Sequence, residues 1–216
     1  EPLEDSSDCV SFDTTMVMND TQDRPLTFRT VFGKTLLQSS GNEETFTVRP
    51  LVSQNRCRAP LLVLKEISIC EAGMEPLKFR QLMRNSEDKL EALKRLRHPN
   101  VVDFIGFKIC RPLDTPAESA DHNWRICALF EYANKGSLDE LLDIVGTVAV
   151  ESVRSWMIQL LEALEFYHRS GVVHGDIHCG RVMIFRQATG GTTVKLQGNI
   201  VDYLPCSPGK RRTLAT

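Results

Sequence analysis

The sequence predicts an α+β protein with two lobes: an antiparallel β-rich lobe that carries one long helix, followed by a mostly helical, abbreviated lobe. Three observations predict this class. Strand-like segments separated by turn residues fill residues 26–69. Helical periodicity of apolar residues runs over 76–96 and again over 150–169. A His-x-Asp turn and a short apolar strand then follow the second helix.

Composition is that of an ordinary soluble globular protein, with 42% hydrophobic and 25% charged residues among 216. The formal net charge of −2 gives no electrostatic reason to expect nucleic acid or an anionic membrane as partner. No apolar run is long enough to span a bilayer. Seven cysteines without a Cys-x-x-Cys pair indicate free thiols in a reducing compartment, so a cytoplasmic location is expected.

The predicted boundaries divide the chain into three parts. Residues 1–25 begin with acidic residues and are expected to be a flexible lead-in, residues 26–130 the β-rich N-terminal lobe, and residues 131–216 the abbreviated C-terminal lobe. The chain lacks an initiator Met, which indicates a segment of a longer protein.

The N-terminal lobe is predicted from strands and one helix. Gly41-Asn42 supplies a turn between two β-rich runs, and Pro60–Ile69 is the strongest strand in the chain. Pro76 suits the first turn of a helix, which ends before His98-Pro99-Asn100 because proline cannot continue it. Further strands are expected over 101–110 and 124–130, joined by a surface loop.

The C-terminal lobe is predicted to hold two helices. Ser137 and Glu140 form a capping box for a helix over Leu138–Val145, which Gly146 can end. The helix over 150–169 carries an apolar stripe that is expected to be core packing. The stripe and its neighbours are Val153, Trp156, Met157, Leu160, Leu161, Leu164 and Tyr167.

Three segments, taken in order, resemble the protein kinase domain: Leu96-Arg97-His98-Pro99-Asn100, Glu131–Leu138 with its Glu-Tyr-x-x-x-Gly-Ser-Leu pattern, and Val172–Asp176 with Val-Val-His-Gly-Asp. The resemblance spans residues 26–204 and implies a protein-kinase-like two-lobed fold. It places Lys65 at the phosphate-pairing lysine and Asp176 at the catalytic-loop aspartate. It also implies a remnant of the hinge at Phe130, Glu131, Tyr132 and Ala133, with Phe130 as gatekeeper.

The same resemblance implies damaged chemistry. Only Gly33 and Gly41 stand where a glycine-rich loop would cover phosphates, and the side chains between them would crowd a triphosphate. Lys89 stands at the glutamate position of the long helix, with Asp88 or Glu91 as substitutes if the register slips. The remaining degenerate positions are His178 for the loop lysine, Arg181 for the magnesium-binding asparagine, and Gly198 for the aspartate of Asp-Phe-Gly, which a four-residue gap would move to Asp202.

The chain looks most like the degenerate kinase-like domain, of fungal type, in the general amino-acid-control kinases that phosphorylate the alpha subunit of translation initiation factor 2. That resemblance implies a catalytically inactive pseudokinase domain without cofactor or metal, which regulates an adjacent kinase domain of the same or a paired chain under amino-acid starvation, and which can form a homodimer.

Three alternatives stay open from the sequence. The first is a weakly active or nucleotide-binding serine/threonine kinase that uses Lys65, Asp176 and Asp202. The second is a zinc site made by His174, His178 and Cys179, which lie close together in sequence. The third is an interaction scaffold within an unrelated kinase chain.

Overall fold

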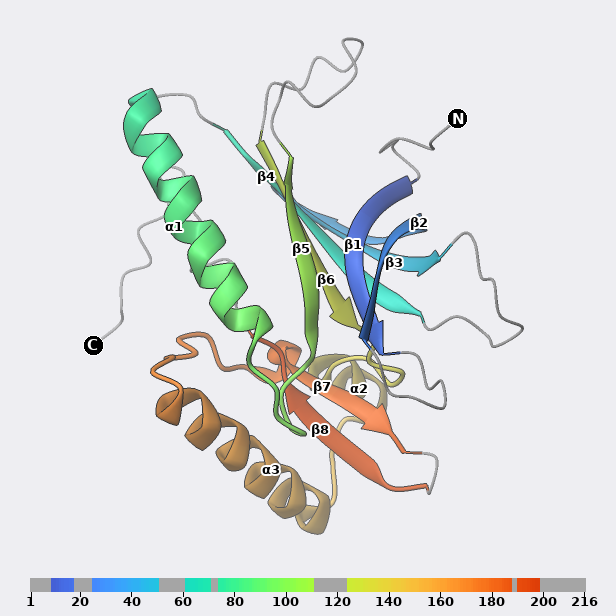
Figure 1. Cartoon of the computed structure of the whole chain (residues 1–216). Helices are drawn as coiled ribbons and strands as arrows, with labels where there is room; N and C mark the ends of the chain where they lie inside the picture. The colour runs from blue at the N-terminus through green and yellow to red at the C-terminus, as the bar shows by residue number, and fades with distance from the viewer. Residues whose placement is uncertain are drawn as a thin grey trace. The chain divides into compact units, whose positions relative to one another are not determined.

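The computed structural model describes residues 9–17, 25–50, 61–70, 74–110, 124–187 and 190–198. The chain folds into two compact units (Figure 1). Of the described residues, the first unit holds those up to 88 and those in 104–132, and the second unit holds 89–103 and 133–198. Helix α1 (Pro76–Lys94) contributes to both units.

The first unit is built on a six-stranded antiparallel sheet in the order β1-β2-β3-β4-β6-β5 (Figure 1). Its edge strands, β1 and β5, also contact each other, so the sheet curls toward a barrel and shields both edges. The strands are β1 (Cys9–Val17), β2 (Pro25–Ser40), β3 (Glu43–Pro50), β4 (Leu62–Ile69), β5 (Phe104–Cys110) and β6 (Trp124–Glu131).

Alternation along the strands sorts side chains onto two faces of this sheet. The inner face of the curl is one hydrophobic cluster that includes Phe32, Leu64 and Leu129, all fully buried. Helix α1 covers the other face, where the rings of Phe79 and Trp124 lie 5.6 Å apart. The face of α1 that is turned inward repeats at helical spacing and consists of Phe79, Met83, Ser86, Leu90 and Leu93.

The second unit packs helices on a two-stranded hairpin of β7 (Val182–Arg186) and β8 (Thr192–Leu196). Helix α2 (Leu138–Val145) and helix α3 (Val150–Arg169) flank this hairpin (Figure 1). Ala163 and Tyr167 of α3 are buried against Val101 and Leu196. The hairpin therefore supplies the core that α2 and α3 share.

A polar network ties the His98-Pro99-Asn100 segment to this unit. The Asn100 amide donates to Gln159 Oε1 and to the carbonyl of Val194, each at 3.0 Å. Gln159 Oε1 also accepts from the backbone N–H of Val194 at 3.0 Å. Because these bonds satisfy buried groups on three segments, the segment belongs to the second unit. The predicted lobe boundary after residue 130 therefore misses residues 89–103.

Several sequence predictions are confirmed. The Ser137 hydroxyl accepts from the Glu140 N–H at 3.2 Å, and the Glu140 carboxylate accepts from the Ser137 N–H at 2.7 Å, so the capping box is complete. Gly146 ends α2 with φ of 71°. Gly41 has φ of 62° in the predicted turn, between the paired residues Ser40 and Glu43. The predicted loop over 111–123 lies outside the described residues.

Two predictions are wrong. Residues 9–17 of the expected flexible lead-in form strand β1, because Val, Phe, Thr and Met outnumber the acidic residues there and favour strand. The apolar stripe on α3 is only partly core. Leu160 and Leu164 pack against the buried cluster of the second unit, but Val153, Met157 and Leu161 are exposed. Periodicity identifies an apolar face and does not say what covers it.

Among the described residues, no helix is long and apolar enough to cross a bilayer.

Two buried thiols lie on the inner face of the sheet, and one of them is expected to be unreactive. A hydrogen bond with Cys110, then burial and the charge of Glu66, raise the pKa of Cys127 well above its usual value. Because only the thiolate attacks an electrophile, we expect Cys127 to resist iodoacetamide near neutral pH while the exposed Cys70 is alkylated. Peptide mass spectrometry after native labelling measures this, with denatured protein as the control. Native labelling of Cys127 as fast as of Cys70 would contradict it.

Candidate functional site

The candidate site is the loop between α3 and β7. Gly171 follows α3 with φ of 72°, which turns the chain out of the helix. His174 is buried, and its Nε2 lies 2.9 Å from the carbonyl oxygen of Gln197. Its Nδ1 accepts from the N–H of Asp176 at 3.3 Å, so Nε2 is the nitrogen that donates to Gln197. His174 thus fixes both the loop and the segment after β8.

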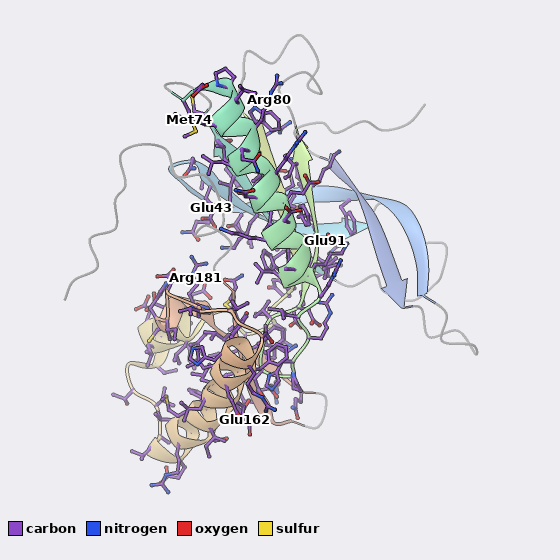
Figure 2. The ribbon with its side chains drawn as sticks, turned by 60° about the vertical axis from the view of Figure 1, so that its left-hand side comes forward. Glu43, Met74, Arg80, Glu91, Glu162 and Arg181 are labelled. Carbon is purple, nitrogen blue, oxygen red and sulfur yellow. The ribbon has the colours of Figure 1, made fainter. Side chains whose placement is uncertain are left out.

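Asp176 and Arg181 form an ion pair within this loop. Arg181 Nε donates to Asp176 Oδ2 at 3.3 Å, and the two side chains are only 16% and 15% exposed. Arg181, labelled in Figure 2, lies at the end of a 3-10 turn over Cys179–Arg181 that immediately precedes β7. Its backbone carbonyl accepts from the N–H of Gln197 at 2.8 Å, which holds the residue against the segment after β8. The guanidinium therefore lies beside the Asp176 carboxylate within the loop.

His178 has a structural contact of its own. Its Nδ1 accepts from the N–H of Gly180 at 3.2 Å and caps the 3-10 turn. A side chain at Gly180 would meet the His178 ring at 3.1 Å, so glycine permits this close approach. His178 Nε2 lies 3.8 Å from Asp176 Oδ2. With His174 facing Gln197, the proposed zinc trio is not brought together, and the described residues contain no group of three His, Cys, Asp or Glu suited to a metal ion.

Gly198 lies two residues after the end of β8, beside Tyr167. A Cβ added to Gly198 would lie 3.1 Å from the hydroxyl oxygen of Tyr167, which is itself buried. An aspartate at this position would therefore require Tyr167 to shift. Asp202, the alternative carboxylate, lies outside the described residues.

Lys65 has a partner that the sequence did not suggest. Its Nζ lies 2.8 Å from Glu43 Oε1, and both side chains are largely buried. Strand register explains the pair: Thr45 is opposite Lys65, so Glu43 is the diagonal neighbour on the same face. Figure 2 labels Glu43 and Glu91. Of the predicted helix positions, Lys89 and Asp88 are exposed on α1 and Glu91 is half-buried.

The turn between β2 and β3 stands where the kinase resemblance would place a glycine-rich loop. The strands stay paired up to Ser40 and Glu43, leaving only Gly41 and Asn42 between them. Leu36 and Leu37 are more than half exposed on β2. The predicted stretch between Gly33 and Gly41 is therefore strand, with a register shift between Leu36 and Gln38, and not a loop that wraps a ligand.

The predicted hinge remnant is split between the two units. Phe130, the predicted gatekeeper, is buried with its ring 5.1 Å from that of Phe104, so it is part of the first unit's core. Glu131 and the exposed Tyr132 end the first unit, and the buried Ala133 begins the second.

A buried charge cluster in the first unit was missed by sequence reasoning. Lys34 Nζ lies 2.8 Å from Glu66 Oε1, and these side chains are 4% and 7% exposed. Arg125 Nη1 lies 3.9 Å from Glu66 Oε2, and Lys34 Nζ is 4.9 Å from the centre of the Phe46 ring. The one sequence signal for this cluster is the alternation along β4, which places Glu66 on the same buried face of the strand as Leu62 and Leu64.

The comparisons with known proteins agree with this architecture. The family profile described as "Protein kinase domain" matches residues 62–197. The chain is 26% identical over 183 residues to "eIF-2-alpha kinase GCN2" of Schizosaccharomyces pombe, a match that covers 85% of this chain and 11% of that protein. It is 28% identical over 136 residues to "Mitogen-activated protein kinase kinase kinase 3" of Arabidopsis thaliana, which covers 63% and 19%. The chain thus spans less than a fifth of either relative.

Among solved structures, Rad53 1-466 in complex with AMP-PNP superposes with a TM-score of 0.56 at 17% identity. The match covers 78% of this chain and 38% of that chain. This likeness confirms the predicted protein-kinase-like two-lobed fold, with an antiparallel sheet in its N-terminal lobe.

Proposed function

Since this chain belongs to the protein kinase domain family, we propose that it is a pseudokinase domain: it keeps the fold, does not transfer phosphate, and regulates a neighbouring protein kinase domain by contact. The process proposed for it is translational control under amino-acid starvation, in the cytoplasm.

The ion pair between Asp176 and Arg181 carries this proposal. Phosphoryl transfer depends on positioning and on metal ions that neutralise the phosphates, and in kinases the loop aspartate must be available to the substrate hydroxyl. Here the carboxylate is engaged by a guanidinium at 3.3 Å. The position that would hold magnesium carries that same guanidinium, which has no acceptor for a cation and repels it. These residues do not fit magnesium-bound nucleotide.

Other described residues support the same conclusion. Gly198 offers no carboxylate and has little room for one beside Tyr167. The two-residue turn at Gly41 presents no glycine-rich cradle for phosphates. Glu43 engages the ammonium of Lys65, which a kinase would direct to the phosphates.

The regulatory part of the proposal rests on similarity. The match to the relative called an eIF-2-alpha kinase covers most of this chain but only 11% of that protein, so the chain corresponds to one part of a much longer kinase. A part that has kinase fold without usable chemistry can still offer surfaces to a catalytic domain. We propose the kinase domain of the same or a paired chain as its partner.

Nucleotide binding tests the proposal. We expect the melting temperature of the chain to stay unchanged by ATP, with or without magnesium, because no bound state is stabilised. A ligand at a hundredfold excess over its dissociation constant would add about 2.7 kcal/mol. An active kinase domain measured in parallel is the positive control. A magnesium-dependent rise that Asp176→Asn abolishes would favour the weakly active kinase instead.

Binding to the proposed partner, a catalytic kinase domain, is a second test of the proposal. We expect the chain to bind the catalytic domain of its own parent kinase in isothermal titration calorimetry and to change that domain's activity. A heat-denatured sample of the chain is the control. Absence of both binding and an effect on activity would contradict the regulatory role.

A further inference from the structure

Two buried thiols of the first unit contact each other. Cys110 is the last residue of β5, and Cys127 lies within β6. Both belong to the hydrophobic cluster on the inner face of the sheet, where they are 7% and 2% exposed. A hydrogen bond joins the two side chains. Because both cysteines are free, two reduced sulfur atoms lie side by side in the core.

The strand register explains why these thiols meet. Pairing of β5 with β6 sets Cys110 opposite Arg125 and Lys108 opposite Cys127. The four residues therefore form a square on one face of the sheet, with the thiols on one diagonal and the cations on the other. The hydrogen bond shows that the diagonal between the thiols is spanned by direct contact.

Positive charge prevails around the pair. Glu66 is opposite Cys127 on the other side of β6, but its carboxylate is engaged by Lys34 Nζ at 2.8 Å. Lys108 and Arg125 then place two further cations beside the thiols. Cations beside a thiol favour the thiolate, which is the form that reacts with oxidants. The surroundings therefore suit thiol oxidation better than an apolar core alone does.

The two thiols are suited to different steps of an oxidation. A hydrogen bond with Cys110, then burial and the charge of Glu66, raise the pKa of Cys127 well above its usual value. Cys127 is therefore a poor first nucleophile, and the first step falls to Cys110 at the end of β5. A thiol that keeps its proton suits the second step, in which a proton leaves together with an oxygen atom.

We propose that Cys110 and Cys127 are a reversible redox pair that hydrogen peroxide oxidises to a disulfide. The Cys110 sulfur attacks the O–O bond and becomes a sulfenic acid, while the Cys110 proton leaves with the other oxygen as water. The Cys127 sulfur then forms the S–S bond, the S–O bond breaks, and the Cys127 proton leaves with the hydroxyl group as a second water. Two electrons pass from the thiols to the peroxide, and a dithiol reductant reverses the change.

Peptide mass spectrometry of the folded chain after exposure to hydrogen peroxide tests the proposal. Peroxide is removed, and the sample is then unfolded in iodoacetamide so that the remaining thiols cannot exchange. We expect a disulfide between Cys110 and Cys127 in the non-reducing peptide map, and recovery of both thiols after dithiothreitol. Cys70→Ala is the matched control: this exposed thiol lies outside the pair, so its removal should leave the yield of the disulfide unchanged.

Two variants test the order of the steps, and circular dichroism verifies that both stay folded. In Cys127→Ala the Cys110 sulfenic acid has no thiol to resolve it, so dimedone should trap it as an adduct. In Cys110→Ala the thiol of Cys127 should stay reduced at the same peroxide exposure. A wild-type chain without the disulfide, a disulfide to any other cysteine, or a dimedone adduct on Cys127 and not on Cys110 would each overturn the proposal. None of these outcomes depends on nucleotide binding or on a kinase partner.

Discussion

Replacing Glu66 with glutamine is expected to lower the free energy of unfolding by about 3–5 kcal/mol. The change keeps the shape of the side chain but removes its charge. Lys34, which is 4% exposed, then loses the carboxylate that lies 2.8 Å from its Nζ in the sheet interior. The loss of the Glu66 charge costs less free energy at Arg125, because the Arg125 side chain is 29% exposed and can reach water. Urea unfolding followed by tryptophan fluorescence measures the loss.

The two tryptophans lie in different units, so the unfolding of each unit can be followed separately. Trp124 belongs to the first unit and Trp156 to the second, so a Trp156→Phe background makes the signal specific for the sheet. The double replacement Lys34→Met with Glu66→Leu removes both charges and should recover most of the stability. Glu165→Gln, which breaks an exposed pair, should cost less than about 1 kcal/mol. A loss of similar size for Glu66→Gln would show that the buried pair is unimportant.

Replacing Asp176 with alanine is expected to destabilise the second unit by about 2–4 kcal/mol. In a working kinase the loop aspartate serves the substrate hydroxyl, so its removal acts on catalysis. In this chain it neutralises Arg181, which is only 16% exposed and would be left without its carboxylate. A Trp124→Phe background leaves Trp156 to report urea unfolding of this unit.

A double-mutant cycle separates the pair from other effects of the aspartate. Arg181→Leu alone and Asp176→Ala alone should each be destabilising, whereas the double variant should be more stable than the sum of the two losses implies. His168→Ala is the control, because this side chain is exposed on α3, outside the loop. Additive losses would mean that Arg181 does not hold Asp176, and the observation behind the proposed function would fail.

Local patterns predicted most of the elements. The helix over Leu138–Val145 was foreseen at its observed ends, because a capping box and a C-terminal glycine mark a helix within its own sequence. The strand ending at Ile69 and the helix beginning at Pro76 follow in the same way. Strand β1 is hard to predict, because acidic residues surround and interrupt its β-forming residues.

The sequence predicted which residues lie in the candidate site, but not which residues they contact. The residues of the loop could be placed by their spacing from His174, since spacing fixes positions within one turn. Glu43 could not be assigned to Lys65, because their pairing depends on strand register across β3 and β4. Lys34 and Glu66 meet across the interior of a curled sheet, and no local pattern encodes that curvature.

The sequence by itself determined most of the helices and strands, and it predicts an arginine where kinases hold a metal ion, because both depend only on residue type and spacing. The tertiary structure alone decided what each charged group faces. Arg181 could have pointed to solvent, yet it pairs with Asp176; the α3 stripe could have been core, yet one side of it lies in solvent. The reason is physical: periodicity fixes the direction of a side chain relative to its own helix or strand, and only the packing of distant segments fixes what lies in that direction.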